Sequence, residues 1–151
     1  MEKKLKIVVP VDFSAASLKA IEFLKLSAAK ADIDAQLVHV VQVNEEDWVC
    51  NAENNETIDR KALQQQEQVA LQKFKDLQQQ LDFQFSYQVL YGGLTTSLVK
   101  FATQQQADLI VMGTKGADGW LERISGSETQ QVVRHATIPV ISIHEHALVS
   151  P

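Results

Sequence analysis

Cysteine is nearly absent from this chain of 151 residues, which contains Cys50 alone. No disulfide can therefore form within the chain, and no Cys or His stands beside Cys50 at the spacing of metal ligands. A single unpaired cysteine is typical of proteins in a reducing compartment. Long apolar runs are absent as well, because none approaches the roughly 18 residues that span a bilayer. We therefore expect a cytoplasmic protein with no membrane contact and no structural metal.

Positively charged residues are also few. The chain has 14 Lys and Arg residues against 19 Asp and Glu, which gives a formal net charge of −5. No stripe of basic residues is visible, so a nucleic-acid surface is excluded as an interpretation. An anionic ligand would have to depend on local backbone N–H groups, because no global positive field attracts it.

Several common catalytic and nucleotide signatures are missing. The first apolar run is followed by Val11-Asp12-Phe13-Ser14 without a G-x-G-x-x-G, and no G-x-x-x-x-G-K-[ST] occurs anywhere. A dinucleotide dehydrogenase and a Walker-type motor are therefore poor interpretations. No Ser, Cys or Lys lies in a recognisable nucleophile elbow, so no catalytic residue is predicted. The sequence places no general base for efficient phosphoryl transfer either, which leaves at most a weak ATPase.

What the chain does contain is an alternation of short apolar runs with stretches of helical periodicity. Its length suits a single domain, which we place over residues 1–146, with a C-terminal tail over 147–151. The expected strands cover residues 5–11, 36–43, 83–91, 107–112 and 139–143. The expected helices cover residues 15–31, 57–81, 94–102 and 127–136.

This alternation predicts a doubly wound α/β fold, a three-layer sandwich around a five-stranded parallel sheet. Continuous apolar runs suit strands that are covered on both faces, and the most apolar run, 107–112, is expected to be the central strand. Such sheets bind ligands where the carboxyl ends of strands meet and the winding reverses. Residues 10–14, the end of the second strand around Val40, and the turn expected at Gly113 should therefore converge on one crevice.

A glycine-bearing segment lies between the fourth expected strand and the last helix. It reads Gly113-Thr114-Lys115-Gly116, nine residues, then Gly126-Ser127. Glycine lets the backbone approach an anion, and a following helix adds free N–H groups and a positive dipole end, so the segment predicts a site for a phosphorylated small molecule. A plain structural loop is the alternative, in which Ser127 and Gln130 form a capping box without any ligand. The glycine spacing alone leaves both interpretations open.

Four segments in the same order resemble the universal stress protein family. The specific match is the signature G-x2-G-x9-G-[S/T], which that family uses for ATP and which falls here on Gly113, Gly116, Gly126 and Ser127. The other matching segments cover residues 7–14, 37–40 and 107–113. The resemblance implies a Rossmann-like fold with strand order 3-2-1-4-5. It also implies a homodimer in which the last strand, from Pro139 to Ile143, pairs with its copy in the other subunit.

The resemblance further implies which residues meet the nucleotide. In ATP-binding members, the positions that meet the adenosine part correspond to Pro10, Asp12 and the Val40 backbone. The positions that hold the ribose and the phosphates correspond to Gly113, Thr114, Lys115, Gly116, Gly126, Ser127, Glu128 and Thr129. Mg²⁺ would accompany the ATP. Asp12 has an alternative role, because an Asp at the end of a strand often caps the next helix.

Glu128 is a departure from the family pattern. ATP-binding members commonly carry a small or apolar residue after the Gly-Ser pair, whereas this chain places a carboxylate in the first turn of the last helix. A carboxylate there stabilises the helix end by roughly 0.3 to 1 kcal/mol. It would also repel a triphosphate unless Mg²⁺ or Lys115 intervenes, and the repulsion would be screened if the side chain pointed outward.

Two functions are compatible with these features. The first is a cytoplasmic stress-response protein that binds ATP, hydrolyses it slowly or phosphorylates itself at most, and acts as a nucleotide-dependent regulator read by a protein partner. The second is a nucleotide-free homodimeric interaction module of the same fold, for which Glu128 is the best support.

Overall fold

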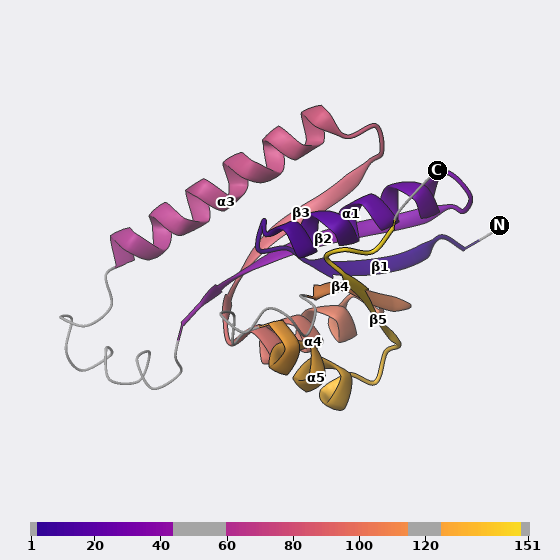
Figure 1. Ribbon diagram of the computed structural model, residues 1–151. Helices are drawn as coiled ribbons and strands as arrows, with labels where there is room; N and C mark the ends of the chain where they lie inside the picture. Colours follow the sequence, from indigo (N-terminus) through magenta and orange to yellow (C-terminus); the bar gives the residue numbers. More distant parts are fainter. Residues whose placement is uncertain (1–2, 44–59, 115–124, 149–151) are drawn as a thin grey trace.

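The computed structural model describes residues 3–43, 60–114 and 125–148 (Figure 1). Every predicted strand and helix is present, with ends displaced by a few residues. In chain order the elements are β1 (Leu5–Pro10), α1 (Ala15–Ala28), β2 (Ile33–Gln42), α3 (Arg60–Gln80), β3 (Phe85–Gly92), α4 (Leu94–Gln104), β4 (Leu109–Thr114), α5 (Ser125–His135) and β5 (Val140–His144).

The strands form one five-stranded parallel sheet in the order β3-β2-β1-β4-β5. This confirms the strand order that the family resemblance implies. The central strand is β1, so the expectation that 107–112 would be central is wrong. Its apolar character reflects cover on both faces, which β1 and β4 share, and does not report its place in the sheet.

Helices cover both faces of the sheet (Figure 1). Helices α1 and α3 lie on one side, and α4 and α5 lie on the other. Alternate residues of β1 point to the two sides: Ile7 and Val9 belong to the core cluster that includes Phe74 of α3, whereas Val8 belongs to the cluster that includes Leu98 of α4. This alternation is the period of a strand, and it confirms the three-layer sandwich.

Strand β4 continues further than the sequence indicated. Gly113 and Thr114 lie inside the strand, opposite Ile143 and His144 of β5. The expectation that the chain turns at Gly113 is therefore wrong. Gly113 packs against the first turn of α1, where an added Cβ would lie 2.7 Å from the Ser17 nitrogen and closer still to the Ala16 carbonyl. Glycine is required here because the two backbones touch.

Helix α5 begins at Ser125, two residues before the predicted start. Ser127 is the third residue of the helix and does not occupy its cap position, so the Ser127–Gln130 capping box is wrong. Lys115 and Gly116 lie outside the described residues. Within the part of the chain that the structure describes, no helix is long and apolar enough to cross a membrane.

Candidate functional site

The carboxyl ends of β1, β2 and β4 come together at one edge of the sheet, beside the start of α5 (Figure 1). The winding reverses between β1 and β4, because β2 and β3 continue on one side of β1 whereas β4 and β5 lie on the other. In open α/β sheets this reversal is where ligands bind. Pro10 ends β1 and is opposite Val38, so Val40 lies beyond the end of β1.

The connection from β1 to α1 is fixed by short hydrogen bonds. The Val11 N–H donates to the Val38 carbonyl at 2.7 Å, and the Ser14 N–H donates to the Asp12 Oδ1 at 2.9 Å. Ser14 is the N-cap of α1, since its hydroxyl accepts a hydrogen bond from the Ser17 N–H. The alternative in which Asp12 caps the helix is therefore wrong. Asp12 stabilises the turn one step earlier, as an Asx turn.

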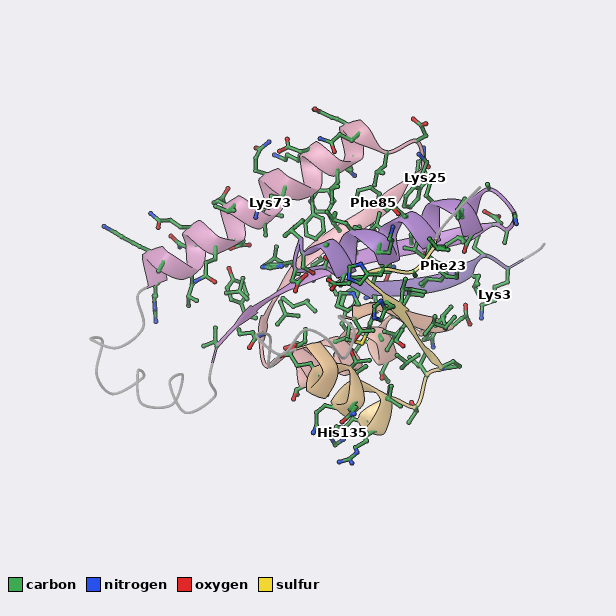
Figure 2. All side chains as sticks on the ribbon, in the orientation of Figure 1. Lys3, Phe23, Lys25, Lys73, Phe85 and His135 are labelled. Carbon is green, nitrogen blue, oxygen red and sulfur yellow. The ribbon has the colours of Figure 1, made fainter. Side chains whose placement is uncertain are left out.

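Phe13 is the residue that turns the chain at this point. Its φ is 63°, a left-handed conformation that is rare for a bulky side chain and costs on the order of 1 to 3 kcal/mol. Its ring is anchored on the α1–α3 side of the sheet, with its centroid 5.0 Å from that of Phe74 and 5.4 Å from that of His39. The Lys73 ammonium lies 5.1 Å from the centroid of the Phe13 ring, and Figure 2 labels Lys73 on α3. These contacts hold Asp12 at the edge of the crevice.

His39, on β2, also contacts the connection between β1 and α1. Its Nδ1 is 2.7 Å from the Val11 carbonyl oxygen, a hydrogen-bond distance. Because Val11 directly precedes Asp12, the histidine fixes the backbone from which the carboxylate extends. His39 is thus a positioning residue for the turn, and it lines a pocket together with Asp12, Phe13 and residues of α3.

Asp12 keeps its charge at the crevice. Partial burial raises the pKa of its carboxyl, but hydrogen bonds from Ser14 and Ser17 outweigh this effect and bring the pKa below its ordinary value. An ionised carboxylate accepts hydrogen bonds and donates none, so Asp12 can accept hydrogen bonds from the hydroxyl groups of a sugar.

Glu128 lies in the first turn of α5, and its side chain is half-buried. Burial and the charge of Asp12 raise the pKa of Glu128, and an interaction with the Gln42 side chain lowers it by less.

The structure brings most of the predicted site residues to this edge. The charge of Asp12 raises the pKa of Glu128, and Thr129 follows Glu128 in α5. Pro10, Val40, Gly113 and Thr114 end the three strands or lie close to those ends. Gly126 and Ser127 lie in the first turn of α5. Lys115 and Gly116 cannot be placed.

Gln42 is the site residue that the sequence did not reveal. It ends β2 with an exposed side chain, and no motif marks it. Gln42 matters only through Glu128, which lies on α5, far away along the chain. The side chains described here are carboxylates and an amide, which suit binding by hydrogen bonds. No group of three or more potential metal ligands occurs among residues 3–43, 60–114 and 125–148.

Comparison with known proteins agrees with this arrangement. Residues 5–144 match the model of the universal stress protein family. Universal stress protein MJ0531 of Methanocaldococcus jannaschii is 34% identical over 139 residues, which cover 91% of this chain and 81% of that protein.

Solved structures share the fold. Protein MJ0577 is 24% identical with a TM-score of 0.69, and the match covers 93% of this chain and 95% of that one. A universal stress protein in complex with cAMP is 18% identical with a TM-score of 0.59, covering 95% of this chain and 99% of that one. One from Archaeoglobus fulgidus in complex with dAMP is 19% identical with a TM-score of 0.59, covering 92% and 97%.

The family model extends from the first residue of β1 to the last residue of β5, so it includes every described element. The strand order and the glycine signature around β4 and α5 agree with it. The chain belongs to the universal stress protein family.

Proposed function

We propose that this protein binds an adenine nucleotide, ATP with Mg²⁺ included, in the crevice at the carboxyl ends of β1, β2 and β4. The observation that carries the proposal is the convergence of these ends with the first turn of α5 where the winding reverses. Relatives of the same fold solved with cAMP and dAMP support the choice of an adenine ligand.

The residues divide into two groups along such a ligand. The adenosine part would lie against Pro10 and Val40, with the ionised Asp12 carboxylate accepting hydrogen bonds from ribose hydroxyls. The phosphates would lie toward the end of β4 and the start of α5. The first N–H groups of a helix have no partner within the helix itself, and the helix dipole favours an anion at that end. The residues proposed for this part are Gly113, Thr114, Lys115, Gly116, Gly126, Ser127 and Thr129.

Nucleotide binding would serve regulation and not turnover. The described residues of the crevice supply carboxylates, an amide and backbone groups, and among them no nucleophile is paired with a base. We therefore propose slow hydrolysis or autophosphorylation at most, with the bound state read by a protein partner in the cytoplasm during stress.

We also propose a homodimer through β5. This strand is at the edge of the sheet next to β4, and Ile141 on it is 36% exposed. An edge strand offers unpaired backbone groups, which an antiparallel copy about a twofold axis would satisfy. A light-scattering mass that corresponds to a monomer at micromolar concentration would contradict this part of the proposal.

Calorimetric titration tests nucleotide binding. Wild-type protein should bind AMP and, with Mg²⁺, ATP. Asp12→Asn should weaken the binding of AMP by at least about tenfold, because the asparagine amide keeps the Asx turn but no longer offers a charged acceptor. Asp82→Asn, an equally small change at an exposed position beyond the end of α3, is the control and should bind as wild type does. Absence of binding by any adenine nucleotide at millimolar concentration would favour the nucleotide-free interaction module.

A further inference from the structure

A pocket of about 420 Å³ lies between α3 and the connection from β1 to α1. That volume is within the range of pockets that hold small organic ligands. Asp12, Phe13 and His39 line one side, and α3 lines the other with residues between Ala62 and Lys73. We call it the α3 pocket. It shares Asp12 with the proposed nucleotide site but lies on the α1–α3 side of the sheet, whereas α5 lies on the opposite side (Figure 1).

Two groups of opposite charge line the α3 pocket. The Asp12 carboxylate is ionised at neutral pH, and its Oδ1 accepts a hydrogen bond from the Ser14 N–H. A carboxylate has about four acceptor sites, so Asp12 can accept further hydrogen bonds from a ligand. The Lys73 ammonium lies 5.1 Å from the centroid of the Phe13 ring, which is another wall of the pocket. Asp12 and Lys73, both within the described part of the chain, form no ion pair with each other.

Phe13 keeps these two charges apart. It directly follows Asp12 in the chain, and its φ of 63° is a conformation that costs a bulky residue energy. Its ring is fixed by Phe74 and His39, at centroid distances of 5.0 Å and 5.4 Å, and contacts Lys73. Strained backbone of this kind is concentrated at functional sites. The side chain of Phe13 therefore connects both charged groups and sets the gap between them.

The wall that α3 contributes is partly apolar. Its lining residues recur at three- and four-residue steps, so they form one face of the helix. On this face Val69 is 54% exposed although it is apolar. Gln65 and Gln66 add amide groups, which both donate and accept hydrogen bonds. A ligand with an apolar side chain would cover Val69, and the burial of apolar surface favours binding.

We infer that the α3 pocket binds a small zwitterion of the free amino acid class, with its ammonium group on Asp12, its carboxylate on Lys73 and an apolar side chain against Val69. A ligand with one charge would satisfy only one of the two charged groups. A zwitterion satisfies both of them through charge-assisted hydrogen bonds. The inference goes beyond the proposed function, since this ligand carries no base, sugar or phosphate.

An NMR titration of the labelled full-length protein tests the inference. The wild type is titrated with L-valine, L-leucine and L-phenylalanine. The amino acid that binds most tightly is then compared with the amine that lacks its carboxylate and with the acid that lacks its ammonium group, which for leucine are isoamylamine and isocaproate. These analogues keep the apolar side chain, so they differ from the amino acid in charge.

Two variants remove the charges of the pocket one at a time. Lys73→Met keeps an unbranched apolar stem beside Phe13, and Asp12→Asn keeps the Asx turn. Lys75→Met is the control, because it makes the same change at an exposed position of α3 that does not line the pocket.

We expect at least one of the three amino acids to bind the wild type with a Kd below about 1 mM. Each single-charge analogue should bind at least about tenfold more weakly, because it loses one charge-assisted contact. Lys73→Met should weaken the amino acid by at least about tenfold and leave the amine within about twofold, since the amine has no carboxylate. Asp12→Asn should weaken the amino acid similarly and leave the acid within about twofold. Lys75→Met should match the wild type.

Two results would overturn the inference. One is the absence of binding by all three amino acids at about 10 mM. The other is an equal loss of affinity for the amino acid and the amine in Lys73→Met, which would show that Lys73 supports the shape of the pocket and does not bind a carboxylate. Neither result bears on the proposed function, which the titration with AMP measures separately.

Discussion

Replacement of Gly113 by alanine should destabilise the protein strongly. The added Cβ would lie 2.7 Å from the Ser17 nitrogen, where ordinary contact begins at 3.4 Å, and it would be nearer still to the Ala16 carbonyl. These neighbours are backbone atoms of the capped first turn of α1, and they cannot rotate away as a side chain could. Either β4 or α1 must move, and both are paired or packed along their length.

The size of the stability loss depends on the clash with these backbone atoms. Overpacking a well-filled core costs typically about 1 to 3 kcal/mol, and a clash with backbone on both sides belongs at the upper end. We therefore expect a loss of about 3 kcal/mol in the free energy of unfolding. For a domain of this size, that loss lowers Tm by about 6 to 12 °C.

Urea denaturation followed by circular dichroism measures the loss, and Gly93→Ala is the matched control. A Cβ at Gly93 would meet its nearest neighbour, Thr96 Oγ1, at 3.9 Å. Gly93 is the N-cap of α4, where alanine is slightly worse, so the control should lose less than about 1 kcal/mol. A loss below about 1 kcal/mol for Gly113→Ala would refute the close approach of β4 and α1.

Two further changes test the turn and the crevice. Ser14→Ala removes the cap of α1 and should lower the free energy of urea unfolding by about 1 kcal/mol, whereas an unchanged value would show that the cap contributes nothing. Glu128→Gln should raise Tm near about pH 7, because a carboxyl whose pKa is raised by folding destabilises the fold once it is ionised. This gain should shrink as the pH falls through the pKa of Glu128 toward about pH 4, and a gain that grows on acidification would contradict the burial of Glu128 beside Asp12.

Much of the fold was predictable because its inner strands contain short apolar runs. A strand buried on both faces leaves such a run in the sequence, and β1 shows one over residues 7–9 and β4 over residues 109–112, whereas His39 interrupts the run of β2. The place of each strand in the sheet is not encoded in this way. Apolar content alone put 107–112 at the centre, whereas β1 is central because the winding reverses there.

The ends of elements near Gly113 were harder to predict. Glycine usually marks a turn, but Gly113 continues β4 because the first turn of α1 leaves no room for a side chain. That reason involves Ala16, which is far away in the sequence, and no local pattern reveals it. The start of α5 was misplaced in a related way, since Ser127 resembled a cap but lies inside the helix.

The candidate site was also predictable only in part. The sequence indicated Asp12 from its place after the first strand and Glu128 from its departure from the glycine signature. It did not indicate that Glu128 is half-buried, because the exposure of its side chain depends on how α5 packs against the sheet. Gln42 was missed for the same reason, since it affects the pKa of Glu128 only once β2 and α5 are placed.

A crystal structure of the protein grown with AMP tests the central claim most directly. We expect the nucleotide at the carboxyl ends of β1, β2 and β4, with its sugar beside Asp12 and its phosphate toward the first turn of α5. Strand ends that stay unoccupied at saturating AMP would contradict the claim.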